Sequence, residues 1–495
     1  MTPARACAHT SARVEKACAL VALALTVTAL SGCRPIVAWF GRDPGRVTLV
    51  EVLDRRGRQR VVVDGVEGPW YDAVGVASLV FTADGHVAYP ARVGSHWHMV
   101  HDGRVGPAHD GVGEAVLSPD GTHLIYAAAR GERWTVVVDG HEQGEWSALQ
   151  SGSLRLTPGP SAGQLAALRW SFIGYRGEDA FVVVDGNVAG PFDAASPALL
   201  DARRSAFATV RHERARVFID GAAGVPFAQV RDLQLVEGRV AYLGHSSAGS
   251  VVMVEGVAGS EHPALRHLRL HPSGRWFAIR SEATTEDAAE AIVLGEQRLP
   301  VVGAVQQAAF LSDARVVWIG VTATHAQVHV EGEAQALHAS ISALVTHGAH
   351  YAYVGEREGQ HHVTVDGVPT AREDEPVDSL ALSATGDVAY HTWRVLDPRA
   401  PPADVIVAPG GPWPAPGFVE DSLVCLSDSP HCAHLAVVDE ELQIVIDGTR
   451  HVPFDLEEAV ASAARSVNRP VLGDDTWLRQ WLLGELRWFL GTPGG

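Results

Sequence analysis

The sequence predicts an all-β protein built from a repeated four-stranded unit. The word VVVDG occurs at 61–65, 136–140 and 182–186, and close variants such as VFIDG at 217–221 recur along the chain. The glycines that end these words are about 40 residues apart, which is a typical length for one structural repeat. The segments between them are rich in Val and aromatic residues, end in Gly-containing turns and lack helical periodicity.

Each unit is expected to contain four antiparallel strands, as the unit 66–103 illustrates. VEGPWYDAV is followed there by ASLVFTADG, HVAYPARVG and SHWHMVHDG. We interpret the second piece as the innermost strand and the last two as the second and third strands, with the VVVDG-like word ending the third. The outermost strand carries the signal GPWYD at 68–72 or GPFD at 190–193, because proline suits an edge strand that needs no further donor.

Four-stranded units of this length are typical of the blades of a β-propeller. We therefore predict about ten to eleven four-stranded repeats over residues 47–455. Because a single propeller usually has about 4–8 blades, two rings are expected, with one unusually large ring as the alternative. The degenerate unit at 281–300 is one candidate seam. The first strands, in 46–65, lack an innermost strand, which suggests that N- and C-terminal strands share a blade.

The acidic residue of the repeated word could be a recurring cation ligand or a recurring turn residue. It stands at a predicted strand end and is followed by glycine, as in tight hairpin turns that need positive φ. This pattern favours the turn. The aspartates concerned are Asp64, Asp139, Asp185, Asp220, Asp366 and Asp447.

The turn between the first two strands of a unit reads SPDG at Ser118–Gly121. With the repeat, this word resembles the WD-repeat-like propellers with S-P-D-G turns of bacterial envelope proteins, including the propeller half of the Tol translocation protein. The resemblance covers residues 47–455. The copies at 82–85, 271–274 and 383–386 read TADG, HPSG and SATG, and these departures leave the subfamily open.

The first 33 residues resemble the signal peptide of a bacterial lipoprotein. Basic residues precede an apolar run at 17–30, whose length suits a signal segment better than a permanent membrane span. The run leads into LSGC, which is similar to a lipobox, so we predict Cys33 as the acylated first residue of the mature chain. An ordinary signal peptide or an N-terminal anchor is the alternative. Arg34 follows Cys33, and the resemblance then favours the outer membrane over the inner membrane.

Residues 34–46 are expected to form a tether and residues 456–495 a C-terminal helical segment. The stretch DDTWLRQWLLGELRWFL is apolar on nearly every side of a helix, so it must be buried against the propeller or against a partner. The net charge of the chain is −19, and the predicted leader is net positive, so the mature chain is more acidic still. Such a surface disfavours nucleic acid and anionic lipid as partners.

Cys425 and Cys432 flank a Ser-Asp-Ser-Pro turn between two apolar runs. In an oxidising compartment they are expected to form a disulfide, and two buried thiols are the alternative. The densest histidine group is His96, His98 and His101. Histidines on exposed strands and turns are the simpler interpretation of this group, so neither a metal site nor a cofactor site is predicted.

No catalytic motif stands in a fitting context. GHSSAG at 244–249 comes nearest to a nucleophile elbow, but Ala248 occupies the position of the final glycine. We therefore expect an envelope protein, held to the membrane through Cys33, that acts as a non-catalytic scaffold for a protein or glycan partner. The alternatives are an envelope enzyme of the glycan lyase or hydrolase type, with active residues in the central funnel, and a metal- or cofactor-binding sensor.

Overall fold

The computed structural model describes most of the chain between residues 36 and 454. The described ranges are 36–43, 46–55, 57–63, 65–82, 85–157, 168–282, 289–301, 303–395, 402–419, 422–425, 431–438 and 441–454. The predicted signal peptide 1–33, with its lipid-attachment residue Cys33, and the predicted helical segment 456–495 lie outside these residues.

The described residues form eleven antiparallel sheets, which we number 1 to 11 in chain order. Sheets 1 to 3 consist of β1 (Ile36–Asp43), β2 (Arg46–Arg55), β3 (Arg58–Val63) and β4 (Val66–Glu67); β5 (Ala73–Val74), β6 (Val80–Phe81), β7 (Val87–Val93), β8 (His96–His101) and β9 (Arg104–His109); and β10 (Gly111–Leu117), β11 (Leu124–Arg130), β12 (Arg133–Val138) and β13 (His141–Glu142).

Sheets 4 to 7 continue the same order, and sheets 2, 4 and 5 have a fifth strand because two short strands pair with the same edge of their long neighbour. They consist of β14 (Ala148–Leu149), β15 (Arg155–Thr157), β16 (Arg169–Arg176), β17 (Asp179–Val184) and β18 (Asn187–Phe192); β19 (Ala194–Ala195), β20 (Leu199–Leu200), β21 (Ser205–Arg211), β22 (Arg214–Ile219) and β23 (Ala222–Ala223); β24 (Gln229–Val236), β25 (Arg239–His245), β26 (Ser250–Val254) and β27 (Val257–His262); and β28 (Leu265–Leu270), β29 (Trp276–Glu282), β30 (Ala289–Leu294) and β31 (Gln297–Pro300).

Sheets 8 to 11 complete the array. They consist of β32 (Ala304–Phe310), β33 (Val316–Val321), β34 (Ala326–Val330) and β35 (Glu333–His338); β36 (Ser340–His347), β37 (His350–Arg357), β38 (Gln360–Val365) and β39 (Val368–Glu373); β40 (Val377–Leu382), β41 (Val388–Arg394), β42 (Ala403–Ala408) and β43 (Gly411–Pro414); and β44 (Val424–Cys425), β45 (Cys432–Val438), β46 (Glu441–Ile446) and β47 (Thr449–Phe454).

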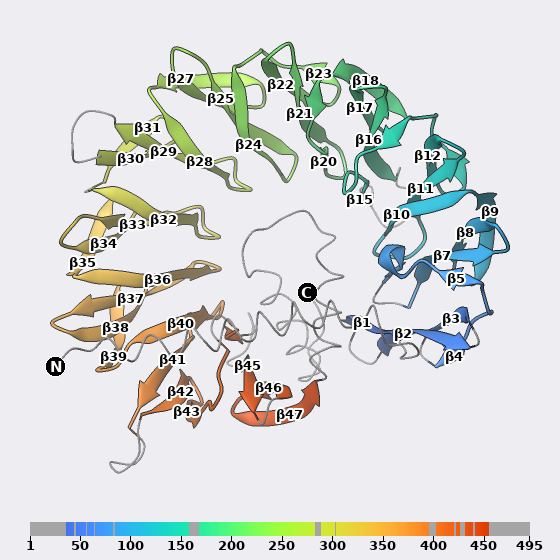
Figure 1. The fold of residues 1–495 in the computed structure, drawn as a ribbon. Coiled ribbons are helices and arrows are strands. Elements are labelled where there is room, and N and C mark those ends of the chain that lie inside the picture. Colours follow the sequence, from blue (N-terminus) through green and yellow to red (C-terminus); the bar gives the residue numbers. More distant parts are fainter. Residues whose placement is uncertain are drawn as a thin grey trace, which may run out of the picture.

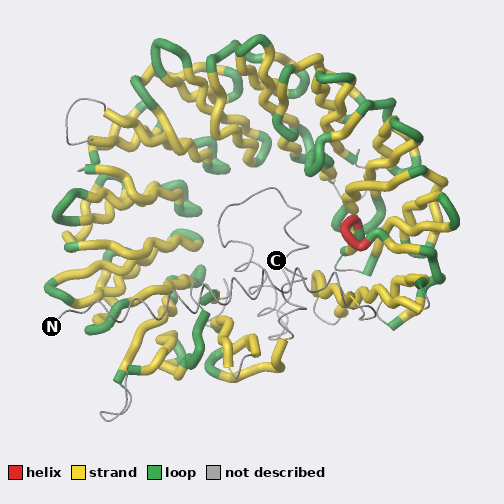
Figure 2. Tube along the Cα trace, in the orientation of Figure 1, coloured by secondary structure: helices red, strands yellow, loops and turns green. Residues whose placement is uncertain are grey.

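The sheets follow one another in chain order around a common centre, as the blades of a propeller do (Figure 1). First strands such as β28, β32 and β36 lie toward the centre, and fourth strands such as β27, β35 and β39 lie on the outside (Figure 1). The prediction of an all-β fold made of four-stranded repeats is confirmed. The only helix among the described residues is a 3₁₀ turn, η1 (Val76–Ser78), drawn in red in Figure 2. No helix of the described part is long and apolar enough to cross a membrane.

Three expectations about boundaries need correction. Residues 34–46 were expected to be a tether, but β1 occupies Ile36–Asp43 and pairs with β2. Sheets 1 and 11 each have four strands of their own, so the described strands of the two ends do not share a blade. The degenerate unit at 281–300 belongs largely to sheet 7, which contacts both sheet 6 and sheet 8. The strand β1 was not predicted because its residues, IVAWFGRD, carry none of the repeated turn words.

Burial explains why the second strand of each sheet is the most apolar. Leu124 to Ala129 of β11 are all buried, as are Val240 to Leu243 of β25. A strand with neighbours on both edges and a packed sheet on both faces needs apolar side chains throughout, whereas the outer strands alternate. The hydrophobic core therefore runs as a series of clusters between neighbouring sheets.

Pairs of aromatic or histidine rings pack across many of the contacts between neighbouring sheets, which we call joints. One ring lies at the end of the outermost segment of a sheet, and the other lies on the second strand of the next sheet. Five such pairs are T-shaped, with centroids 5.5–6.3 Å apart: Tyr71–Tyr89, His109–Tyr126, Trp146–Phe172, Phe227–Tyr242 and His338–Tyr353. Edge-to-face pairs of this kind contribute about 0.5–1.5 kcal/mol beyond their buried area. Tyr71, the tyrosine of the GPWYD signal, therefore packs between sheets 1 and 2.

Candidate functional site

The repeated acidic residue is a turn residue that also fastens its own sheet. Asp139 has φ 48° and Gly140 has φ 85°, as two-residue hairpin turns require. The Oδ1 atom of Asp139 accepts the backbone N–H of Leu124 at 2.9 Å, and Oδ2 pairs with Nδ1 of His123 at 2.7 Å. This arrangement ties the turn after the third strand to the start of the second strand. We call it the turn clamp.

The turn clamp recurs around the array. The same carboxylate-to-backbone bond is made by Asp102, Asp185, Asp220, Glu255, Glu331, Asp366 and Asp447. The turn interpretation is confirmed for the described members of the repeated aspartates, while Asp64 lies outside the described residues. Because these carboxylates already hold backbone donors, they are not an array of free ligands.

The basic partner of the clamp differs between sheets. His86, His350 and His431 pair with the aspartate of their own sheet at 2.6–2.7 Å. Arg204 of sheet 5 instead pairs both with Asp220 of its own sheet and with Glu255 of sheet 6, each at 2.7 Å. The longer arginine therefore also crosses a joint between sheets.

The densest histidine group does not converge on one point. Nδ1 of His98 lies 2.9 Å from the carbonyl of Gly106, and Nε2 of His101 lies 2.9 Å from the carbonyl of Gly121. Nδ1 of His96 lies 3.1 Å from Oγ of Ser95. Each ring thus contacts a local partner. Within the described ranges, no group of three or more His, Cys, Asp or Glu side chains could hold a metal ion.

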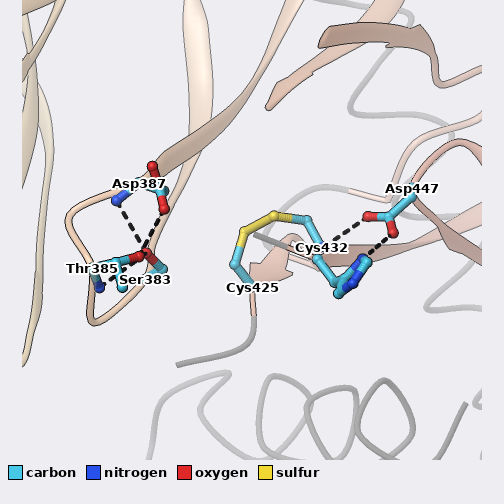
Figure 3. The surroundings of a disulfide bond; sticks show 7 residues. Ser383, Thr385, Asp387, Cys425, Cys432 and Asp447 are labelled. Carbon is cyan, nitrogen blue, oxygen red and sulfur yellow. Dashed lines mark hydrogen bonds and ion pairs between the residues drawn. A yellow bond between two sulfur atoms is a disulfide. The ribbon is translucent and has the colours of Figure 1, made fainter. Parts of the chain in front are cut away.

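Cys425 and Cys432 are cross-strand partners of β44 and β45, and a disulfide of 2.06 Å joins them. The bond lies next to the turn clamp of sheet 11, where the Oδ1 atom of Asp447 accepts the N–H of Cys432 at 3.0 Å (Figure 3). Both cysteines are buried in the cluster that fills the joint between sheets 10 and 11. The disulfide therefore fixes a short first strand to the second.

Bulges in the innermost strands turn polar side chains toward neighbouring sheets. The ladder between first and second strands shifts register in several sheets, for example between Arg231 and Gln234 of β24 and between Val305 and Gln307 of β32. At the bulge in β24, Oδ2 of Asp232 accepts the N–H of Leu268 in the next sheet at 2.9 Å. Bulges commonly re-aim side chains next to functional sites, so the inner strands are where a ligand site is expected.

One polar groove lies between the inner strands of sheets 7 and 8. It has a volume of about 240 Å³, and its lining includes Arg266, His267, Arg269, Gln306 and Gln307. The exposed Arg266 binds Glu290 through Nη2 at 2.8 Å, whereas Arg269 donates to the carbonyl of Leu268 at 3.1 Å and has no carboxylate partner among the described residues. Burial, followed by the charge of Arg269, lowers the pKa of His267, which leaves a neutral imidazole beside the guanidinium.

A second polar cluster is buried in sheet 10. The Nδ1 atom of His391 lies 2.7 Å from Oδ1 of Asp378, and Nε2 lies 3.5 Å from Oδ1 of Asp404. Burial alone would lower the pKa of His391, but the hydrogen bond to Asp378 and the carboxylate of Asp404 outweigh it and raise that pKa. Phe418 stacks on the ring at 4.1 Å. The two carboxylates occupy opposite sides of the imidazole, so its geometry is that of a structural ion pair.

Sequence reasoning identified the turns and the cysteine pair but missed the groove and this cluster. Neither has a motif, because their residues come from different repeats or from bulged positions. The sequence signal that could have located the groove was a departure from the repeated pattern in the inner strands. Inner strands carry Arg-His-x-Arg at 266–269 and Gln-Gln at 306–307.

A scan against protein-family models finds no match, and a search of curated proteins finds no similar sequence. Solved structures to which the fold is similar include the eukaryotic initiation factor (TM-score 0.31, 10% identity, covering 62% of this chain and 88% of that chain) and the tricorn protease (0.26, 12%, 82% and 52%). The β-propeller domain of the Trilobed protease from Pyrococcus furiosus is a third (0.24, 11%, 62% and 96%). These comparisons assign no activity to this chain.

Proposed function

We propose that this protein is a lipid-anchored envelope lipoprotein whose propeller is a non-catalytic scaffold that binds a protein or glycan ligand. The groove between β28 and β32 carries the proposal. It offers the guanidinium of Arg269 and the amide of Gln306, both on exposed side chains, whereas Nε2 of Gln307 donates to the carbonyl of Leu344 at 2.9 Å. An arginine without a carboxylate partner beside an amide suits a ligand that presents a carboxylate and hydroxyl groups.

The clamp geometry supports a binding role over a catalytic one. In the described part of the chain, the His–Asp pairs closest to a catalytic dyad are the turn clamps and the His391 cluster. The clamp aspartates hold backbone N–H groups, and His391 is enclosed by Asp378, Asp404 and Phe418. A general base needs a reactive group within hydrogen-bond reach on its free side, and His391 has a carboxylate there.

The anchor and the ring arrangement belong to the same proposal. The lipobox-like LSGC supports acylation of Cys33, and the resemblance at Arg34 favours the outer membrane. Several acyl chains on one residue hold a protein stably on a membrane. The unbroken succession of contacts from sheet 1 to sheet 11 supports one large ring over two. We also propose that this propeller is related to the propeller half of the Tol translocation protein.

Binding of the detergent-solubilised full chain to acidic oligosaccharides and acidic peptides tests the groove. We expect Arg269→Ala combined with Gln306→Ala to lower affinity at least about tenfold, because one charge-assisted hydrogen bond and one amide contact are lost. Arg104→Ala, on the exposed outer strand β9, is the matched control. Equal binding by all three proteins, or turnover of an oligosaccharide, would contradict the proposal. Labelling with a fatty-acid probe should disappear in Cys33→Ala.

A further inference from the structure

The groove between sheets 7 and 8 lies where a tie between inner strands is replaced. In sheet 6, Gln234 accepts the N–H of Leu270 through Oε1 at 2.9 Å and donates to the carbonyl of Leu268 through Nε2 at 2.5 Å. Gln234 directly follows the bulge of β24, and Arg269 directly follows the bulge of β28. Arg269 donates only within its own strand, to the carbonyl of Leu268, and is exposed. A position that ties two sheets in sheet 6 therefore presents a guanidinium to the groove in sheet 7.

Other groups hold the joint between sheets 7 and 8 together. The guanidinium of Arg266 pairs with Glu290 at 2.8 Å, and Oε2 of Glu290 accepts the N–H of Val305 in sheet 8 at 2.6 Å. The side chain of Glu290 is only 10% exposed. The charge of Arg266 is thus already balanced, and it belongs to the joint. The groove takes its unbalanced positive charge from Arg269.

A second arginine without a carboxylate partner lies on the neighbouring inner strand. Arg231 of β24 is exposed, and its guanidinium donates to Oε1 of Gln229 at 3.1 Å, with no carboxylate partner among the described residues. The next residue, Asp232, accepts the N–H of Leu268, which fixes β24 beside β28 at this level. Neighbouring sheets pack about 10 Å apart. Arg231 and Arg269 therefore stand on adjacent inner strands separated by about that distance.

The uncharged lining of the groove suits hydroxyl groups better than apolar side chains. The amide of Gln306 is exposed, and burial lowers the pKa of His267, so its imidazole is neutral. An amide and a neutral imidazole each donate and accept hydrogen bonds, as a hydroxyl group does. The apolar members of the lining, Ile279 and Ala308, are both buried. A sugar chain thus fits the lining better than a peptide with apolar side chains.

We propose that this groove is one part of a longer site for an acidic sugar chain, in which Arg269 binds one carboxylate and Arg231 binds a second. The inference rests on the proposed function and narrows its ligand to a chain of uronic acid residues. Such a chain would run across the inner strands β24, β28 and β32, which face the centre of the array (Figure 1). Because the protein has a net charge of −19, most of its surface repels this ligand, and the unbalanced arginines set where it binds.

Calorimetry of the detergent-solubilised full chain with galacturonate and with trigalacturonate tests the proposal. We expect the trimer to bind at least about tenfold more tightly than the monomer, because a second charge-assisted contact is made within one ligand. Maltotriose has the hydroxyl groups but no carboxylate, and triglutamate has the carboxylates but no sugar. Each should bind at least about tenfold more weakly than trigalacturonate.

Single substitutions separate the two arginines. Arg231→Ala should weaken binding of the trimer about tenfold and leave binding of the monomer unchanged, which also shows that the variant is folded. Arg231→Lys keeps the charge and should retain most of the affinity for the trimer. Arg269→Ala should weaken binding of both ligands. Arg104→Ala, on the outer strand β9, is the matched control and should change neither.

The outcomes distinguish this inference from the proposed function. Equal affinity for monomer and trimer, or an unchanged trimer affinity in Arg231→Ala, would overturn the longer site and leave a groove that binds one acidic group. Equal binding of triglutamate and trigalacturonate would overturn the assignment to a sugar chain. Binding of none of the acidic ligands would overturn this inference and the proposed function together.

Discussion

The joint between sheets 5 and 6 and the joint between sheets 10 and 11 have the same backbone hydrogen bonds but different side chains. Phe227 meets Tyr242 edge to face at 6.3 Å in the first. In the second, Ala415 stands at the position of Phe227, and Phe418 packs against His434 instead, with ring centroids 5.5 Å apart. The turn clamps on both sides are alike, with a carboxylate bound to the N–H of Val240 or of Cys432. The comparison teaches that turns and clamps define the sheets, while rings fill the space between them.

Removing a ring should have the largest effect. Phe227→Ala is expected to lower the free energy of unfolding by about 3–5 kcal/mol, because the buried ring is lost and a cavity is left. Urea unfolding followed by circular dichroism measures the change. Val225→Ala is the matched control, since Val225 is 53% exposed and its loss should cost less than about 0.5 kcal/mol. Equal losses in the two variants would show that the joint ring does not hold the sheets together.

Acid should affect the joint between sheets 10 and 11 through His434. Burial, followed by the charge of His391, lowers the pKa of His434 to about 4, below the ordinary value of about 6.5. The unfolded chain therefore binds the proton first, and stability falls as the pH drops from about 6.5 toward 4. The full contribution is about 3 kcal/mol. His391 has the opposite sign, since its raised pKa adds stability that is lost as the pH rises through that value.

The variant His434→Phe isolates this contribution. It carries the kind of ring found at other joints, so we expect its unfolding free energy to fall less steeply than that of the wild type between pH 6.5 and 4. Urea titrations at a series of pH values make the comparison. His338→Phe is an informative second variant, because burial also lowers the pKa of His338 to about 4. An unchanged acid slope in His434→Phe would mean that His434 is already charged in the folded protein.

Cutting a turn clamp should have a smaller effect that is similar in both regions. Asp447→Ala removes the acceptor for the N–H of Cys432 and the partner of His431 (Figure 3), and an unpaired backbone donor costs about 1–3 kcal/mol. Asp447→Asn keeps an acceptor and tolerates the φ of 47° at this position, so it should lose less. Calorimetric melting temperatures rank the two variants. A greater loss in Asp447→Asn would contradict the clamp.

Adding a ring at position 415, beside a hollow of about 210 Å³, should have the smallest effect and the opposite sign. Ala415→Phe is expected to raise the free energy of unfolding by about 1 kcal/mol, as cavity-filling changes commonly do. The midpoint of urea unfolding reports the change. Ala241→Phe is the control, because Ala241 is fully buried in a packed cluster and a larger side chain there should destabilise. A comparable loss in both variants would mean that the joint has no room for a ring.

The repeat made the fold predictable, and departures from it carried what was missed. VVVDG ends β12 and β17 because Val suits a sheet core and Asp-Gly suits the hairpin that follows. The role of Asp139 in binding Leu124 could not be read from the sequence, because the two residues meet only after the hairpin closes. The packing of Phe418 against His434 depends on which positions face each other across a joint, and no single strand contains that information.

The two joints can be compared most directly by a double-mutant cycle at positions 415 and 434. Ala415→Phe and His434→Tyr together recreate the pair found at Phe227 and Tyr242. The account predicts a favourable coupling free energy of about 0.5–1.5 kcal/mol between the two changes, as edge-to-face pairs give. A coupling of zero, or an unfavourable one, would contradict the claim that positions 415 and 434 face each other across the joint as Phe227 and Tyr242 do.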